Sequence, residues 1–276
     1  MKNKMIGSLL LILGFSFTIQ AQHSLTKKWE SEARFLVPES VFFDKTKQVL
    51  YVSNIDGTDP WAKDGAGSLG MLGLDGRIIA AEWIVGLNAP KGMAMFEGML
   101  YVADLDQIVI VDPSTGFEVS RITISTADGL NDISIDEQGV IFVTDSKAGK
   151  LYRVKNGAPS VLLDGLKGPN GVLCHKGQVY LLNDGGLYKV EGDEVKLIAD
   201  GLEGFTDGIE PVKEGGFIVS CWAGVIYFVD LTGKKELLID GRQGKINSAD
   251  IGYDPEKRIV YVPTFWKNSV VAYELK

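Results

Sequence analysis

A short β-rich phrase recurs six times along the chain, and this repeat constrains the fold more than any other feature. Each copy begins with an aromatic or branched residue. The copies are Tyr51–Asn54, Tyr101–Asp104, Phe142–Asp145, Tyr180–Asn183, Ile218–Cys221 and Tyr261–Thr264. Their first residues are 50, 41, 38, 38 and 43 positions apart, close to the roughly 40 to 50 residues that one four-stranded propeller blade uses. The period predicts an all-β chain that forms a six-bladed β-propeller.

The residues around each copy support this prediction. Upstream lies a short strand that ends in a turn, as in residues 133–139, and downstream lie two more strands, as in residues 151–163. The pair Asn156-Gly157 between those two strands is a strong hairpin signal, because both residues tolerate the positive φ of a tight primed turn. Helical periodicity is not sustained anywhere after the first twenty residues.

The two ends of the repeat predict how the ring closes. The last repeat begins near Lys245 and has room for only three strands before Lys276, while residues 29–37 form an orphan strand ahead of the first repeat. We expect this N-terminal strand to complete the sixth blade beside the C-terminal strand, which would leave no long unpaired edge.

The N-terminus has the pattern of a secretory signal peptide. Lys2 and Lys4 precede an apolar run, residues 5–19, that is short for a membrane span and is followed by the small residue Ala21. A retained anchor is the alternative, but no stop-transfer flank follows the run, and no cysteine near Ala21 supports a lipid anchor. We therefore expect cleavage after Ala21, a single propeller domain over residues 22–276, and an exported protein, periplasmic or secreted, without a membrane anchor.

Charge and cysteine content exclude some classes of partner. Residues 1–21 carry two lysines and no acid, so the remainder has 26 basic and 36 acidic side chains and a net charge of −10. Such a surface repels phosphate backbones, so we expect no nucleic-acid partner. Two cysteines, Cys174 and Cys221, are too few for a disulfide framework; one bridge is conceivable, but two unpaired buried thiols are the simpler interpretation.

Polar residues recur at one register of the repeat, 10 to 12 positions before each copy of the phrase. These residues are Glu39, Lys91, Asn131, Asn170, Asp207 and, in the sixth repeat, Ala249 or Asp250. Buried strands would ordinarily be apolar there, and the innermost strands of a propeller surround its channel. The shared register therefore predicts a polar ring at the channel, although any single Asn or Asp beside Gly is more often a turn former or cap.

Three members of the ring have the chemistry of a metal site. Glu39, Asn170 and Asp207 offer hard oxygen ligands, and two carboxylates balance one divalent cation. Lys91 adds one positive charge, which would either orient an anionic substrate or neutralise Asp207 or Glu39.

Four phrases around the ring resemble the regucalcin and gluconolactonase family of six-bladed propellers over essentially the whole chain after the leader. They are Pro38-Glu39-Ser40-Val41, Leu130-Asn131-Asp132-Ile133, Pro169-Asn170-Gly171-Val172 and Thr206-Asp207-Gly208-Ile209. The resemblance implies a divalent metal, calcium or alternatively zinc, on Glu39, Asn170 and Asp207. It also implies that Asn131 lies beside metal and substrate and that Asp132 contributes to the substrate side. The activity it implies is lactone hydrolysis, and related propellers cleave organophosphates or aryl esters.

The sequence departs from that family at a position that recognises sugar. Members that act on sugar lactones often carry an arginine two residues before the Asn131 equivalent, and Gly129 stands there in this chain. A long insertion in the first repeat, residues 54–70 with Trp61, is either a lid over the channel mouth or an ordinary surface loop. The metal set is complete, whereas the sugar-recognition set is not.

Other catalytic schemes lack their residues. A Ser-His-Asp triad needs a positioned histidine, and apart from His23 the chain after residue 21 has only His175, for which a surface role is expected. Clustered His and Cys ligands for tetrahedral zinc are missing, as is a phosphate-binding glycine loop.

Two functions remain. The first is a metal-dependent hydrolase of a small-molecule lactone or ester, in which Asp207 acts as general base or nucleophile, Asn131 orients the substrate, Asp132 supports it and Lys91 adds charge. The second is a non-catalytic binding propeller that a central cation stabilises. We expect a monomer in either case.

Overall fold

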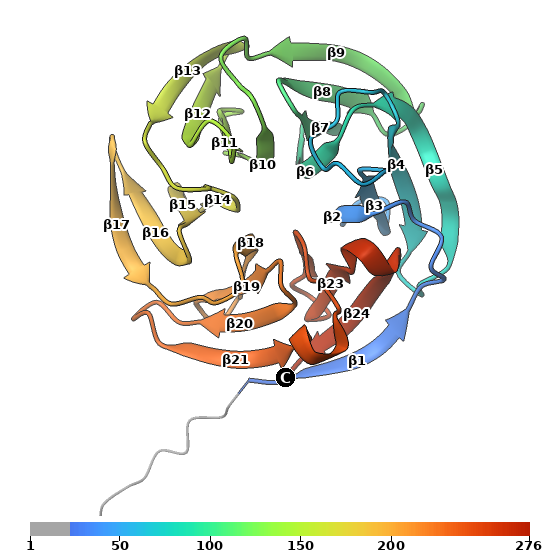
Figure 1. The fold of residues 1–276 in the computed structure, drawn as a ribbon, viewed down its shortest axis with the longest axis vertical. Coiled ribbons are helices and arrows are strands. Elements are labelled where there is room, and N and C mark those ends of the chain that lie inside the picture. The colour runs from blue at the N-terminus through green and yellow to red at the C-terminus, as the bar shows by residue number, and fades with distance from the viewer. Residues whose placement is uncertain (1–22) are drawn as a thin grey trace, which may run out of the picture.

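Six four-stranded antiparallel sheets surround a central channel in the computed structural model, which describes residues 23–276 (Figure 1). The predicted six-bladed propeller is confirmed. The predicted leader and its cleavage after Ala21 lie outside the described residues. Over the part of the chain that is described, no helix has the length and apolar character needed to cross a membrane.

Each blade runs from an inner strand at the channel to an outer strand at the rim. Blade 1 contains β2 (Pro38–Asp44), β3 (Val49–Asn54), β4 (Gly67–Gly73) and β5 (Ile78–Leu87). Blade 2 contains β6 (Pro90–Phe96), β7 (Met99–Asp104), β8 (Gln107–Asp112) and β9 (Phe117–Thr123). Blade 3 contains β10 (Leu130–Ile135), β11 (Ile141–Asp145), β12 (Lys150–Lys155) and β13 (Ala158–Leu163). Blade 4 contains β14 (Val172–His175), β15 (Gln178–Asn183), β16 (Gly186–Glu191) and β17 (Glu194–Ala199).

The last two blades complete the ring. Blade 5 contains β18 (Thr206–Pro211), β19 (Phe217–Cys221), β20 (Val225–Val229) and β21 (Lys235–Asp240). Blade 6 contains β22 (Gly252–Asp254), β23 (Ile259–Pro263), β24 (Val270–Leu275) and the N-terminal β1 (Leu25–Glu30). Two short 3-10 turns, η1 (Arg242–Gly244) and η2 (Phe265–Lys267), are the helical elements among the described residues.

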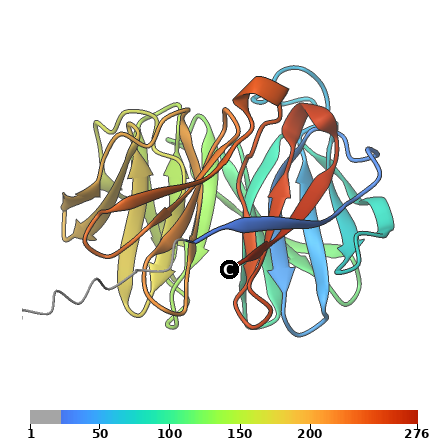
Figure 2. The same cartoon turned by 90° about the horizontal axis from the view of Figure 1, so that it is seen from below.

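The ring closes as predicted, but with a different segment of chain. β1 pairs with β24 from Leu25↔Leu275 to Glu30↔Val271, so the strand begins upstream of the predicted range 29–37 and overlaps it only at Trp29 and Glu30. Most side chains of this outermost strand are exposed, and the apolar alternation that would have revealed it is therefore weak. Residues 31–37 instead link the rim to the channel (Figure 2).

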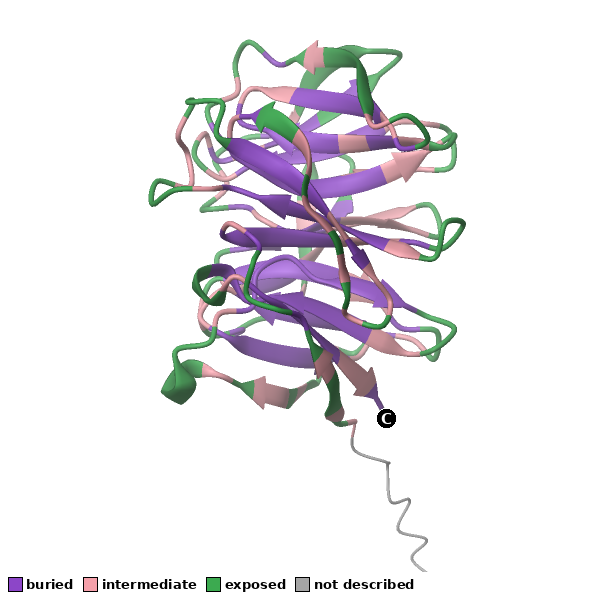
Figure 3. Cartoon of the chain, turned by 90° about the vertical axis from the view of Figure 1, so that its right-hand side faces the viewer, coloured by how far each residue is buried: buried purple, intermediate pink, exposed green. Residues whose placement is uncertain are grey.

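The core lies between neighbouring blades. In Figure 3 buried residues form the middle of the strands, and exposed residues gather in the connecting loops. The aromatic or branched residue that opens each phrase contributes to this core, and Tyr51 and Tyr261 are almost completely buried. The repeat therefore reflects a packing position that each blade must fill.

Candidate functional site

The ring residues lie where the inner strands leave regular pairing. The β-ladder between first and second strands is interrupted at the ring position in blades 1, 2, 3 and 5. The interruptions fall between Pro38 and Ser40, Pro90 and Met93, Leu130 and Ile133, and Thr206 and Ile209. A bulge bends its strand and re-aims a side chain. These irregular stretches hold Glu39, Lys91, Asn131 and Asp207, so their side chains are not confined to strict alternation.

Hydroxyl groups of the repeated phrase satisfy backbone N–H groups at these irregular stretches. Ser53 Oγ accepts from Ser40 N at 2.9 Å, and Thr144 Oγ1 accepts from Asp132 N at 3.0 Å. In blade 5, Ser220 Oγ accepts from Gly208 N at 2.9 Å. Because a buried unpaired N–H is costly, the third residue of the phrase supports the ring geometry directly.

Three oxygen atoms at the ring are buried without a hydrogen-bond partner: one each on Glu39 (Oε2), Asn170 (Oδ1) and Asp207 (Oδ1). Only two other side-chain atoms in the described part of the chain share this condition, on Asn54 and Tyr253. Buried polar oxygens are normally paired, so orphaned ones require an explanation. The sequence-predicted ligand set thus supplies three of the five unpaired atoms.

Burial and mutual repulsion set the charge state of the two carboxyls. Burial raises the pKa of Glu39 from 4.5 to about 7, and the positive charge of Lys91 opposes this shift. Burial raises the pKa of Asp207 well above its usual range, and the charges of Glu39 and Asp250 add to the effect. Lys91 and a hydrogen bond from the Asn170 side chain favour the ionised form of Asp207. These interactions show that the ring residues share one electrostatic environment.

Lys91 is the buried cation of this ring. Its side chain is almost fully buried, and burial lowers its pKa while the charges of Glu39 and Asp207 raise it. The Lys91 Nζ lies 4.4 Å from the centre of the Trp61 ring, a cation–π contact. Trp61 belongs to the β3–β4 loop, so the first-repeat insertion does reach over the ring.

The same tryptophan fills the space beside Gly129. A Cβ atom built on Gly129 would lie 2.8 Å from Trp61 Cζ3 and 2.8 Å from Lys147 Cγ. A larger residue at position 129 would therefore need both side chains to move. The Trp61 indole therefore occupies space that an arginine side chain at position 129 would need.

Asn131 and Asp132 are both buried in the channel wall, but their side chains form different hydrogen bonds. The Asn131 amide donates to Ser146 Oγ at 2.9 Å. The Asp132 carboxylate accepts from Val172 N and from Ile133 N, each at 2.7 Å, and so ties blade 3 to blade 4. Its pKa is raised, mainly by burial.

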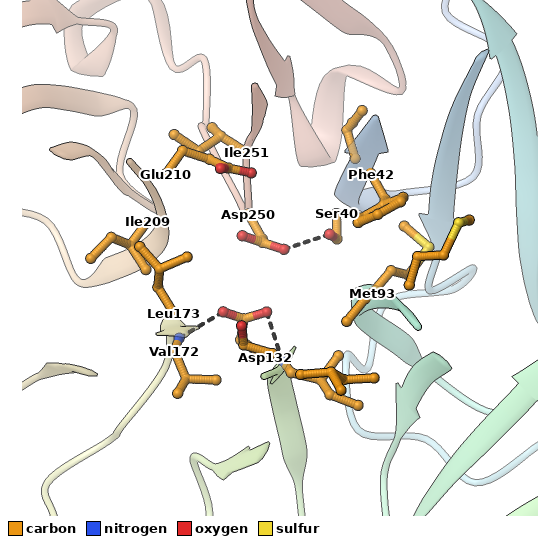
Figure 4. Close-up of a pocket in the computed structure, with 16 residues that line it drawn as sticks. Ser40, Phe42, Met93, Asp132, Val172, Leu173, Ile209, Glu210, Asp250 and Ile251 are labelled. Atoms are coloured by element: carbon orange, nitrogen blue, oxygen red, sulfur yellow. Dashed lines mark hydrogen bonds between the residues drawn. The ribbon is translucent and has the colours of Figure 1, made fainter. Parts of the chain in front are cut away.

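A cavity of about 220 Å³ continues along the channel beyond the ring. Asp132 and Asp250 point toward each other across it (Figure 4), and Ser40 Oγ donates to Asp250 Oδ2 at 2.5 Å. Glu210 also lines it, and burial raises the pKa of this carboxyl well above its usual range. Glu39, Asn170 and Asp207 are not among the residues that line this cavity.

Sequence reasoning left several of these residues without a role. For the sixth ring position the sequence leaves Ala249 and Asp250 open: Ala249 packs in an apolar cluster, while Asp250 pairs with Ser40 and lines the cavity beyond the ring. The position of Trp61 over Lys91 depends on the path of a loop, for which the repeat carries no signal. Ser40 directly follows Glu39 in the sequence, and this adjacency was the only signal that Ser40 also lies at the channel.

The histidine and the two cysteines that the sequence offered are not part of the ring. His175 is at the end of β14 and lines a separate surface groove. Cys174 and Cys221 are free thiols whose pKa values burial raises to about 12. Within residues 23–276, no group of three or more His, Cys, Asp or Glu side chains is arranged to hold a metal; the predicted set has two carboxylates and takes its third oxygen from an amide.

Comparison with known proteins supports the fold assignment. No protein-family model matches the chain, and no curated protein does. A solved structure of a candidate gluconolactonase has a TM-score of 0.69 at 14% identity, covering 93% of each chain. A gluconolactonase from Xanthomonas campestris has a TM-score of 0.67 at 14% identity, covering 88% of this chain and 87% of its own. A streptogramin B lyase reaches 0.67 at 12% identity, covering 92% and 98%. The predicted resemblance to gluconolactonase-like propellers is confirmed at the level of the fold.

Proposed function

We propose that this protein is a metal-dependent hydrolase of lactones or esters, with its reaction centre at Glu39, Asn170 and Asp207. The observation that carries the proposal is the set of three buried oxygens without partners on those three residues. A divalent cation would satisfy all three at once and would offset the charge that burial now disfavours on Glu39 and Asp207. Oxygen-only ligands favour calcium, with zinc as the alternative.

The residues of the ring divide the work of hydrolysis. The chemistry that a cation supplies when bound is polarisation of the substrate carbonyl. Water adds to the carbonyl carbon, Asp207 takes its proton, the ester C–O bond breaks, and the proton passes to the leaving oxygen. Asp207 is alternatively the nucleophile. Asn131 orients the substrate, Asp132 holds neighbouring strands in place, and Lys91 contributes positive charge.

The structures that resemble this chain are consistent with such a function, because one of them is described as a gluconolactonase and another as a candidate gluconolactonase. Export to the periplasm or medium and a monomeric state remain part of the proposal.

Metal analysis of the purified protein, followed by a lactone and ester panel with calcium, zinc, manganese or magnesium, tests the proposal. We expect one bound divalent cation and hydrolysis that a chelator removes. Protein that carries no metal and cleaves nothing in any of these conditions would overturn it.

A non-catalytic binding propeller is the second candidate function. Two observations favour it: the three unpaired oxygens are inaccessible to water, and Trp61 covers Lys91. In that case the cation would stabilise the channel, and metal binding would be found without hydrolysis.

A further inference from the structure

An apolar cluster lies directly on the polar ring, at the end of the channel where the inner strands begin. Its buried members are Val37, Ile55, Ala89, Leu105, Ala249 and Phe265, with Trp61 and Trp222 packed against them. Each buried member precedes a first strand or follows a second strand. In antiparallel blades these positions share one end, so the cluster, called here the entrance cluster, is the layer between the ring and solvent.

Other aromatic side chains extend the entrance cluster outward. Trp222 and Phe265 meet edge to face at 5.6 Å, and Phe265 meets Trp266 at 4.7 Å. Phe205, directly before β18, is 78% exposed at this end. Figure 2 shows the β3–β4 loop and both 3-10 turns rising on the same face. Aromatic groups therefore cover the ring at this end.

Backbone strain accompanies these side chains. Phe205 has a φ of 65°, Phe265 a φ of 50° and Val37 a φ of 57°. Non-glycine residues rarely adopt positive φ, least of all β-branched ones, and such residues cluster at functional sites. The fold thus keeps two phenylalanines and one valine at this end in a backbone conformation that these residue types rarely adopt.

Two lysines at this mouth already form ion pairs. Lys63 Nζ lies 2.6 Å from an Asp106 oxygen, and Lys147 Nζ lies 3.0 Å from an Asp128 oxygen. Lys91 is covered by Trp61. These three lysines are therefore not free to bind substrate hydroxyls, and burying unmatched hydroxyls weakens binding.

We propose that Trp61 determines specificity and that the substrate carries an apolar arm, an alkyl group on the lactone or ester, which packs against Trp61, Trp222 and Phe265. This inference rests on the proposed hydrolase function and narrows its substrate class. A polyhydroxylated lactone is disfavoured because the wall offers hydrocarbon where its hydroxyls would need donors and acceptors.

The test is a series of five-membered lactones with methyl, propyl and hexyl substituents, compared with a polyhydroxylated five-membered lactone in the presence of calcium. For the wild type, kcat/KM should rise about fourfold for each buried methylene, and the polyhydroxylated lactone should be the poorest substrate. Trp61→Ala and Trp61→Gln should flatten the dependence on chain length. Trp83→Ala, the same deletion on the outer strand β5, should keep it; melting temperatures establish that each variant is folded.

The outcomes separate this inference from the hydrolase proposal. Hydrolysis that ignores chain length, that prefers the polyhydroxylated lactone, or that keeps its chain-length dependence in the Trp61 variants overturns the inference and leaves the hydrolase function standing. If the wild type cleaves no lactone with any divalent cation, the hydrolase proposal fails, and calorimetric binding of the corresponding non-hydrolysable lactams decides the inference. Binding that strengthens with chain length in the wild type but not in Trp61→Gln supports it, and binding without that difference overturns it.

Discussion

Glu39 and Asp207 place two carboxyls in a buried ring that contains a single lysine. The cost of ionising them is visible in their raised pKa values, which burial causes and Lys91 only partly offsets. Asn170 contributes an oxygen without charge, so the set as a whole is suited to one divalent cation. In the proposed function, a bound cation would supply the positive charge that Lys91 alone does not provide.

Asp207→Asn separates the chemical role of this residue from its structural role. The amide keeps the shape but cannot take a proton, so we expect kcat to fall at least about a hundredfold. The melting temperature of the metal-free variant at pH 8 should match or exceed that of the wild type, because the substitution removes a charge that burial penalises. His175→Ala is the control and should leave activity and melting temperature nearly unchanged; an active Asp207→Asn would remove this residue from the mechanism.

The raised pKa values also predict how stability depends on pH. Between pH 4.5 and about 7 the folded protein retains a proton on Glu39 that the unfolded chain has released. Rising pH in this window therefore lowers the free energy of unfolding of the metal-free protein, by up to about 1.4 kcal/mol per pH unit and proton. Asp132, Asp207 and Asp250 shift in the same direction.

Melting curves in a chelator from pH 5 to pH 8 measure this effect. We expect the melting temperature to fall across the range, the slope to be smaller in Glu39→Gln, and calcium to flatten it by compensating the ionised ligands. A melting temperature that rises steadily with pH in the chelator would contradict the assigned protonation states.

At the scale of elements, the irregular start of the inner strand positions the ring residues in blades 1, 2, 3 and 5. The hydroxyls of Ser53, Thr144 and Ser220 satisfy the backbone where the ladder breaks. One repeated phrase therefore fills the core with its first residue and supports the ring with its third. The outer strands contribute no residue to the ring, which is consistent with the exposure of β1.

Deleting residues 24–30 tests the contribution of β1 to closure. The truncation exposes the edge of β24 and removes Trp29, whose ring lies 5.9 Å from that of Tyr261. We expect the melting temperature to drop by at least about 10 °C, since the truncation removes a whole strand and a partly buried tryptophan that packs on the core, and we expect aggregation through the free edge. Lys28→Ala, which breaks only the exposed pair with Glu274, is the control and should change little. A truncated protein that melts like the parent would show that β1 does not stabilise the ring.

The sequence predicted the elements whose signal is local and periodic. The phrase spacing located all six blades, and the register count located Glu39, Asn170 and Asp207. The N-terminal strand was predicted several residues too far along the chain, because β1 is mostly exposed and its apolar residues show little alternation. The sequence named Trp61 and Asp250 but could not predict their contacts, because these join segments that are distant in sequence: Trp61 with Lys91, and Ser40 with Asp250.

At the scale of the whole molecule, the starts of the inner strands are joined around the channel. Asp250 N donates to Glu39 O at 2.9 Å between blades 6 and 1, and Val172 N donates to Asp132 between blades 4 and 3. The three proposed ligands come from blades 1, 4 and 5, so one cation would connect blade 1 with two blades that are not its neighbours in the ring. Stability of the propeller and occupancy of the site should therefore be coupled.

Calcium titration of the purified protein measures that coupling. A ligand that binds only the folded state at a hundred times its Kd raises the free energy of unfolding by about 2.7 kcal/mol, which corresponds to about 5–10 °C in a domain of this size. We expect a gain of this order, reversal by a chelator, and slower amide exchange in β2, β14 and β18 together. Asp207→Ala should abolish the response, and Asn170→Ala should weaken it, because it removes one neutral oxygen and leaves both carboxylates. If no divalent cation shifts the wild-type melting temperature, and Asp207→Ala behaves identically, then the ring is a polar lining of the channel and its unpaired oxygens do not form a metal site.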